Sequence, residues 1–277
     1  MKISIITTVT DPDKRMDAWR EAMNNYLDFA DEVIVVNGGA PLILKPPLRE
    51  ILLPWPDDWS WEELPKHLNA GLQQATGDWV IKLDIDQFIH EANFEELRYK
   101  LNELDDRKMA VGSLMKVNVY FQGKYAKTGG LNIAINKKRF DDAVFGKDIN
   151  IKTDLCEPIK FTGEYDDKGV PVGIGFRDGL LGNTGINCWN FSYAFKTKEV
   201  CKDIFYRQAL AYERYFGKAV WGKTREGCWN RLINAYKAVV QRGLKQAEDF
   251  NIFPKYIRDT YANLKPEQFG YNGWGII

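Results

Sequence analysis

The chain has 277 residues, of which 45% are hydrophobic and 27% are charged. This balance is that of a globular protein with one sizeable core, and it excludes an intrinsically disordered chain. Because no apolar run approaches the roughly 18 residues that cross a bilayer, and no basic and apolar signal segment precedes the first expected strand, we expect a cytoplasmic protein without a transmembrane segment.

The formal net charge of zero conceals an uneven distribution. Residues 1–110 hold 12 basic and 21 acidic side chains, which leaves 26 of the 38 basic and 17 of the 38 acidic side chains for residues 111–277. The basic second half is compatible with an anionic partner, such as a diphosphate, an acidic glycan or DNA. It is equally compatible with two surfaces of the protein that complement each other.

The N-terminal part alternates between apolar strands and amphipathic helices. Residues 3–9 form a β-branched run that stops at Asp11-Pro12, as a buried parallel strand does. Apolar side chains then recur at helical spacing before the next strand begins. The expected strands are residues 3–9, 33–36, 51–53 and 79–83, and the expected helices centre on residues 16–27, 64–75 and 94–104.

The pattern changes after residue 110. Alternating apolar residues predict strands over 117–121 and 131–135. Residues 140–190 are rich in Gly, Asp and Lys with weak periodicity, which is typical of loops that assemble a site over a rigid sheet. Helical spacing returns over 197–217 and 225–243. We therefore expect an α/β fold, with a mixed, mainly parallel sheet flanked by helices and a C-terminal helical extension.

Two carboxylates, Asp84 and Asp86, stand where the strand over 79–83 ends. In open sheets of this kind, ligands collect at the carboxyl ends of the strands. Side chains alternate along an extended chain, so two residues with one between them project in the same direction. Such carboxylates repel each other unless a cation lies beside them, and hard oxygen ligands suit Mn²⁺ or Mg²⁺. The pair therefore predicts a site for one of these metals, completed by a diphosphate, although a polar strand-to-loop junction is the simpler alternative.

The residues before this pair resemble a known family. Asn69-Ala70-Gly71, Ala75-Thr76-Gly77-Asp78 and Asp84-Ile85-Asp86 occur in this order, with an apolar strand before the last. This resembles the N-x-G, A-x-G-[DE], strand and D-x-D pattern of the family 2 glycosyltransferases, which have the Rossmann-like GT-A fold. With the first two strands, the resemblance covers residues 1 to about 140. It implies a hexosyl- or pentosyltransferase that moves a sugar, with inversion, from a nucleotide-sugar donor to an acceptor hydroxyl on a glycan or a lipid-linked acceptor.

The resemblance also implies roles for individual residues. It places Thr8 and Asn37 at the nucleobase, Lys66 and Asn69 near the ribose or phosphates, Asp84 at the ribose or the waters of the metal, and Asp86 on the metal itself. The family usually has Asp where this chain has Asn37, and an amide donates as well as accepts, so the choice of nucleobase stays open. His90 lies four residues past Asp86 and becomes a third metal ligand if the loop folds back; a structural or exposed histidine is the alternative.

Inversion needs a carboxylate that takes the proton of the incoming hydroxyl on the far side of the sugar. The candidates in the weakly patterned region are Asp148, Asp154, Glu157, Glu164 and Asp178. We favour Asp178, in Gly175-Phe176-Arg177-Asp178-Gly179, with Asp154 second. An ordinary Asp-Gly turn is the alternative for Asp178.

The tryptophans Trp55, Trp59 and Trp61 cluster just before the expected helix over 64–75. Aromatic faces stack on sugars and bases, so the cluster is either a ligand platform or an ordinary packing contact. The sequence leaves both interpretations open.

We expect a catalytic unit over residues 1–195, made of a nucleotide-sugar half (1–110) and an acceptor half (111–195), with a helical extension over 196–277. Two other functions remain open: a phage-type glycosyltransferase that acts on hydroxymethylated DNA bases, and a non-catalytic scaffold that binds nucleotide-sugars or glycans. A dinucleotide-dependent dehydrogenase is excluded, because no G-x-G-x-x-G follows the first strand.

Overall fold

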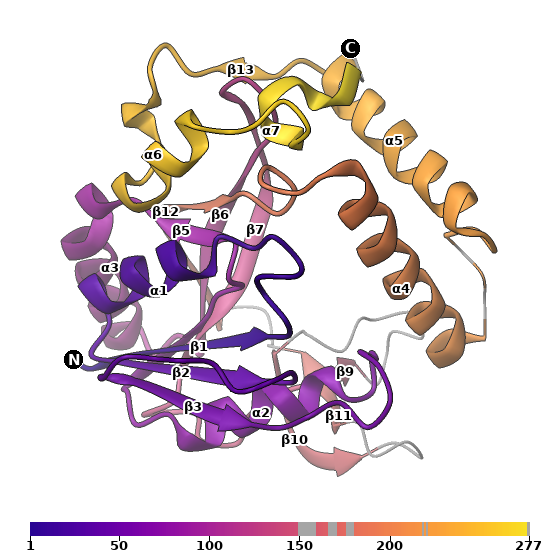
Figure 1. Cartoon of the computed structure of the whole chain (residues 1–277). Helices are drawn as coiled ribbons and strands as arrows, with labels where there is room; N and C mark the ends of the chain where they lie inside the picture. The colour runs from indigo at the N-terminus through magenta and orange to yellow at the C-terminus, as the bar shows by residue number, and fades with distance from the viewer. Residues whose placement is uncertain (149–158, 166–170, 176–179, 218, 220, 276–277) are drawn as a thin grey trace.

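The computed structural model describes residues 1–148, 159–165, 171–175, 180–217, 219 and 221–275 (Figure 1). Within them the main element is a nine-stranded mixed sheet in the order β3-β2-β1-β4-β7-β6-β12-β5, with β13 paired to β7. All of these strands except β5 and β7 run in one direction. The strands are β1 (Ile3–Val9), β2 (Glu32–Asn37), β3 (Leu48–Leu52), β4 (Trp79–Lys82), β5 (Gln87–Ile89), β6 (Val111–Val119), β7 (Lys124–Asn136), β12 (Leu181–Asn190) and β13 (Lys245–Gln246).

The helices cover both faces of this sheet. They are α1 (Trp19–Phe29), α2 (Leu64–Gln74), α3 (Phe94–Asp106), α4 (Lys198–Phe216), α5 (Arg225–Gln241), α6 (Lys255–Ala262) and α7 (Phe269–Asn272). Alternate residues of one strand point to opposite faces, so Ile5 of β1 packs in the cluster that contains α1, whereas Ile6 packs in the cluster that contains α2. The expected fold class, a mixed and mainly parallel sheet flanked by helices, is thus confirmed.

The C-terminal helices begin and end at recognisable capping residues. The side chain of Thr197 caps the start of α4 and that of Thr224 caps the start of α5. Gly217, with φ of 68°, ends α4 in the left-handed conformation that glycine adopts without strain. None of the helices in the described part of the chain is both long and apolar enough to span a bilayer.

A second sheet replaces most of the loops expected between residues 140 and 190. Its strands are β8 (Ala143–Phe145), β9 (Lys147–Asp148), β10 (Ile159–Tyr165) and β11 (Pro171–Gly175), in the order β8-β10-β11-β9. Strands of two or three residues carry too little alternation to be recognised, and the register of β10 shifts between Phe161 and Glu164. The expectation of loops was therefore wrong for these segments.

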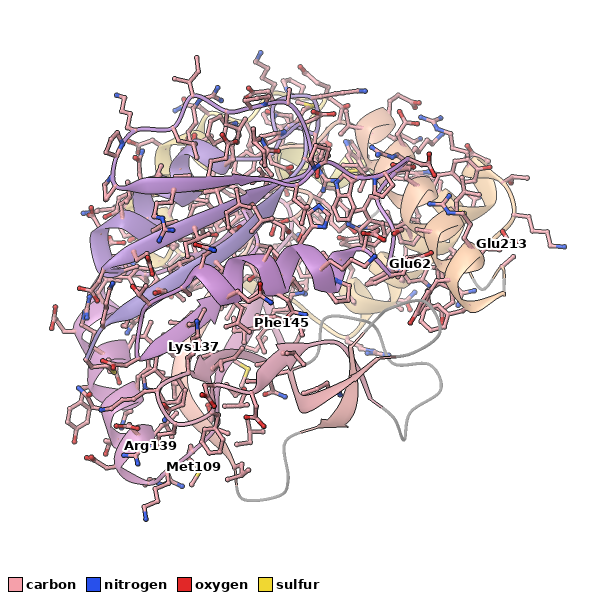
Figure 2. All side chains as sticks on the ribbon, turned by 90° about the horizontal axis from the view of Figure 1, so that it is seen from below. Glu62, Met109, Lys137, Arg139, Phe145 and Glu213 are labelled. Carbon is pink, nitrogen blue, oxygen red and sulfur yellow. The ribbon has the colours of Figure 1, made fainter. Side chains whose placement is uncertain are left out.

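Two side chains fasten α2 to the segments beside it: Asn69 to the second sheet, and Lys137 to the end of β7. The Asn69 side chain donates to the carbonyl of Phe145 at 2.9 Å and accepts from its amide at 2.8 Å. Lys137 donates to the carbonyls of Leu72, at 2.7 Å, and Ala75, at 2.6 Å, at the carboxyl end of α2. Figure 2 shows Phe145 and Lys137 on the same side of that helix.

The main sheet curls strongly between β4 and β5. These strands are separated in sequence by residues 83–86 only, yet β7, β6 and β12 lie between them in the sheet. In a flat sheet, four spacings of about 4.8 Å would separate them by about 19 Å. The connecting segment contains a hydrogen-bonded turn and reaches only about 14 Å. The curl therefore brings β5 and β12 round to the end of β4.

Part of the uneven charge is neutralised by ion pairs within the fold. Several ion pairs join a cation from residues 111–277 to an anion from residues 1–110, namely Arg139 with Asp105, Lys196 with Asp17, Arg207 with Asp58, Lys255 with Asp28, and Arg258 with Glu91. Of the two interpretations of the sequence, complementary surfaces within the protein thus account for part of the excess charge.

Candidate functional site

The carboxyl ends of several parallel strands meet at one edge of the main sheet, and a cavity of about 270 Å³ opens there. Thr8 from β1, Asp84 after β4, Lys116 from β6 and Asn190 from β12 all line it. Because these residues lie far apart in the sequence, the cavity exists only in the folded chain.

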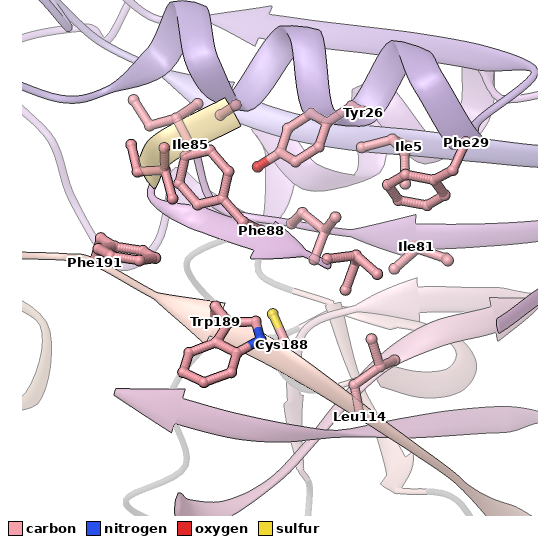
Figure 3. Packing of buried hydrophobic residues seen from close by; sticks show 14 of the residues in the cluster. Ile5, Tyr26, Phe29, Ile81, Ile85, Phe88, Leu114, Cys188, Trp189 and Phe191 are labelled. Carbon is pink, nitrogen blue, oxygen red and sulfur yellow. The ribbon is translucent and has the colours of Figure 1, made fainter. Parts of the chain in front are cut away.

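The two predicted carboxylates lie on a tight turn rather than on an extended segment. The amide of Gln87 donates to the carbonyl of Asp84 at 2.8 Å, and the Tyr26 hydroxyl donates to the same carbonyl at 2.6 Å. Between the carboxylates, Ile85 is buried in the core beside Phe88 and Tyr26 (Figure 3). Since Ile85 anchors the turn, Asp84 and Asp86 on either side of it both line the cavity.

Asp84 is already engaged within the protein. Its Oδ1 lies 2.8 Å from the ammonium of Lys82, a lysine whose side chain is only 7% exposed. Its Oδ2 accepts a hydrogen bond from the side chain of Gln87 at 3.0 Å. Both oxygens thus have partners, which suits a positioning or water-mediated role better than that of the principal metal ligand.

Asp86 is the less compensated carboxylate. Burial, followed by the neighbouring charges of Asp84 and Asp17, raises the pKa of Asp86, whereas the charge of Lys196 acts in the opposite direction. A carboxylate whose charged form is disfavoured in this way is stabilised by an added cation. The chemistry of the pair fits Mn²⁺ or Mg²⁺, because both side chains offer only hard oxygen atoms.

In the part of the chain that the structure describes, Asp84 and Asp86 do not belong to a larger set of metal-binding side chains. Within the described residues, no group of three or more His, Cys, Asp and Glu side chains is placed to hold a metal ion. Mg²⁺ sites that bind phosphorylated substrates often use only one or two carboxylates, with the remaining ligands supplied by phosphate oxygens and water. Asp84 and Asp86 fit that type of site.

A buried ion pair supports the wall of the cavity next to Asp86. The ammonium of Lys196 lies 2.5 Å from Asp17, and the two side chains are only 3% and 1% exposed. Arg15 contacts the other oxygen of Asp17 at 3.0 Å. All three residues line the cavity, so this wall carries positive charge close to the acidic turn.

Two further cations reach the cavity from the second half of the chain. Arg207 of α4 lines the cavity and pairs with Asp58, which lies between Trp55 and Trp59. Lys116 of β6 is half-buried, and among the described residues its ammonium has neither an ion-pair nor a hydrogen-bond partner. The sequence did not single out these residues, and the excess of basic side chains after residue 110 was the only signal that pointed to them.

The tryptophan cluster forms one wall of the cavity. Trp55, Trp59 and Trp61 all line it. The indole of Trp55 donates to the hydroxyl of Thr10 at 2.8 Å and stacks on His67 at 3.7 Å between ring centroids. The ring of Trp59 packs edge-on against Trp61. The cluster is therefore packed and also lines the cavity, and its use as a ligand platform stays a prediction.

Three residues expected at the donor are placed elsewhere. Asn37 is fully buried, donates to Ala40 and Glu50 and accepts from the amide of Gly39. Lys66 pairs with Glu63 at 2.6 Å, and Asn69 holds β8 as described above. None of these three lines the cavity. Their polar groups bond to nearby loops, to α2 and to the second sheet, so of the residues expected around the donor only Thr8, Asp84 and Asp86 line the cavity.

His90 has a structural position rather than one beside Asp86. Its Nδ1 accepts from the amide of Ala92 at 3.1 Å, which caps a short 3-10 helix (Glu91–Asn93), and its Nε2 lies 3.2 Å from the carbonyl of Asn251. His90 does not line the cavity. Because both ring nitrogens contact backbone groups, His90 caps this helix in the structure, and its expected role as a third metal ligand stays a prediction.

Any manganese-dependent affinity of the wild-type protein for a nucleotide-sugar should stay within about twofold in His90→Ala, because His90 does not line the cavity. The lost cap should lower the stability by about 1 kcal/mol. Calorimetric titration and thermal unfolding measure the two effects separately. A tenfold or greater loss of affinity would restore His90 as a ligand.

The carboxylates favoured as general base, Asp178 and Asp154, lie outside the described residues, as does Glu157. Asp148 lies in β9 and Glu164 lies in β10, and the structure describes the backbone of both residues. The assignment of the base therefore stays a prediction from the sequence.

No family model and no curated protein matches this chain. Several solved structures do. Residues 1–349 of TarS from S. aureus match over 87% of this chain and 80% of theirs, with 17% identity and a TM-score of 0.37. TarS 1–349 in complex with UDP matches over 43% of this chain and 36% of that one, with 25% identity and a TM-score of 0.33.

A second matching protein is the galactosyltransferase LgtC, in complex with donor and acceptor sugar analogs. It matches over 49% of this chain and 58% of that one, with 15% identity and a TM-score of 0.31. In the full TarS structure, the match spans only 22% of the TarS chain. The matches include GT-A glycosyltransferases, as the sequence resemblance anticipated. Because all three TM-scores lie below 0.5, the fold class assigned to this chain depends on its own strand order and not on these matches.

Proposed function

We propose that this chain is a metal-dependent glycosyltransferase that moves a sugar from a nucleotide-sugar to an acceptor hydroxyl, with inversion. One observation carries the proposal: Asp84 and Asp86 share a core-anchored turn at the carboxyl edge of a mixed parallel sheet, and they face a cavity whose lining includes several cations and aromatic rings. Cations and a metal ion suit a diphosphate, and aromatic rings suit a base or a sugar.

Different residues of the cavity would contact different parts of the donor. Thr8 and the tryptophan wall would receive the nucleoside, and Lys116 and Arg207 would lie along the phosphates. Asp86 would hold Mn²⁺ or Mg²⁺ directly, with Asp84 at its water ligands or at the ribose. When bound, the metal would neutralise the negative charge that develops on the departing diphosphate.

Transfer needs one proton acceptor. The acceptor oxygen would form a bond to the anomeric carbon while the bond from that carbon to the diphosphate breaks, and a carboxylate would take the hydroxyl proton. Asp17 is the other carboxylate in the described lining, but Lys196 and Arg15 already hold it. We therefore keep Asp178, and after it Asp154, as the proposed base.

A titration tests the proposal. UDP-glucose, UDP-N-acetylglucosamine and GDP-mannose are each titrated into the protein with manganese and again with EDTA. At least one should bind at least about tenfold more tightly with manganese, because the metal bridges protein and phosphates. If none of the three binds with manganese, the proposal fails for these donor classes.

Turnover then separates an enzyme from a scaffold. A glycosyltransferase should slowly hydrolyse the donor that binds, releasing nucleoside diphosphate, whereas a scaffold should return it intact. A DNA acceptor is tested by retention on duplex DNA, which should fall steeply as salt is raised if phosphates are bound. The ion pairs between the two halves favour a glycan acceptor, because they use part of the excess basic charge within the protein.

A further inference from the structure

A second cavity, of about 260 Å³, adjoins the first. The two share a wall made of Lys116, Asn190, Ser192 and Tyr193. The far side of the second cavity comes from α5, which contributes Tyr236 and the side chains one turn along the same face. Figure 1 shows α5 beside α4, on the flank of the main sheet. The helical extension thus encloses a space that opens next to the acidic turn.

Aromatic rings dominate this second cavity. Tyr236 of α5 packs edge-on against Tyr120 and against Tyr193, with ring centroids 5.6 Å apart in both pairs. Val119 and Val239 add apolar surface. Tyrosine offers an apolar face together with a polar hydroxyl, a combination that suits the C–H faces and hydroxyl groups of a sugar ring.

The shared wall adds hydrogen-bonding groups that are already held in place. The Asn190 amide donates to Asn118 at 2.7 Å and accepts from the Ser192 hydroxyl at 2.8 Å. Asn118 in turn donates to Thr128 at 3.2 Å. Each side-chain amide has two donor hydrogens and two acceptor lone pairs, so Asn118 and Asn190 keep capacity for a ligand after these bonds. Groups fixed in this way are suited to read hydroxyls at defined positions.

We propose that the second cavity is the acceptor site, and that its occupant is a carbohydrate ring placed against Tyr193 and Tyr236. The assignment rests on the proposed function. The ring would direct one hydroxyl past Asn190 and Ser192 toward the sugar held in the first cavity. Lys116, whose ammonium has no partner among the described residues, stands between the two cavities and would face the departing diphosphate.

The size of the cavity also indicates the occupant. A volume of about 260 Å³ lies just below the roughly 300–1,000 Å³ typical of pockets for drug-sized ligands. It suits one small ring and not a nucleic-acid duplex. The assignment further implies that α5, in the segment expected to be an extension outside the acceptor half, completes the acceptor site.

Filling the cavity from α5 tests this assignment. Ala235→Trp places a large ring at its rim, and Asn234→Trp, at the neighbouring exposed position that does not line the cavity, is the matched control. The probe is a mixture of methyl α-glucoside, methyl β-galactoside and methyl N-acetyl-β-glucosaminide, observed by saturation-transfer NMR with manganese and UDP or GDP, whichever binds. Calorimetry follows the affinity for that nucleotide in parallel.

Wild type and Asn234→Trp should show saturation transfer to at least one glycoside, and Ala235→Trp should weaken it at least fivefold with nucleotide affinity unchanged. Tyr236→Ala, which removes the platform instead of filling the space, should show the same loss. Equal signals in both cavity variants and wild type, or no glycoside signal beside intact nucleotide binding, would overturn the acceptor site alone. Failure of wild type to bind either nucleotide would instead overturn the proposed function and this assignment with it.

Discussion

Asp86→Asn should reduce turnover of the nucleotide-sugar donor by about 100- to 1,000-fold, the usual cost of removing a group that stabilises charge in the transition state. The amide keeps the shape of the side chain but loses the negative charge that would attract the metal. Release of nucleoside diphosphate with manganese measures the effect. Asp106→Asn, at an exposed carboxylate that ends α3, is the control and should leave turnover unchanged.

The same substitution should leave the fold intact and make it more stable near neutral pH. Burial and the charge of Asp84 raise the pKa of Asp86. The contribution of Asp86 to the free energy of unfolding is therefore fully present below its pKa in the unfolded chain, and it is lost as the pH rises through its pKa in the folded protein. Asparagine does not ionise, so the gain in Tm should appear at pH 7.5 and disappear toward pH 3. Near wild-type turnover, or a lower Tm at pH 7.5, would contradict the role assigned to Asp86.

Lys196→Met should destabilise the protein by about 3 kcal/mol, because it leaves the buried carboxylate of Asp17 without its closest cation. We expect the lower part of the usual range, since Arg15 still contacts that carboxylate. The free energy of unfolding in urea measures the loss. Lys202→Met is the control: its partner Glu226 is 63% exposed, so the change should cost less than about 1 kcal/mol.

A double substitution checks that the loss comes from the ion pair. Asp17→Asn combined with Lys196→Met removes both buried charges, and it should be more stable than Lys196→Met alone. If the double variant is no more stable than the single one, the cost lies in the packing of the Lys196 side chain and not in an uncompensated charge.

The sequence by itself determined the elements whose signals are local. Apolar periodicity predicted β1, β2, β4 and the main helices to within a few residues. The residues 84–86 were also placed correctly at a strand end, because a run of buried residues followed by two acids marks where a strand leaves the core. In those cases the forces that fix the structure act between residues that are close in sequence.

Only the tertiary structure decided which polar side chains meet. Asn37 and His90 carry suitable chemistry, yet nearby backbone groups already use their hydrogen-bonding atoms. Lys116, Lys196 and Arg207 lie at least 30 residues after Asp86 and reach the cavity through the curl of the sheet and the docking of α4. A buried polar group must find a partner, and that partner is set by distances in space that one-dimensional spacing does not record.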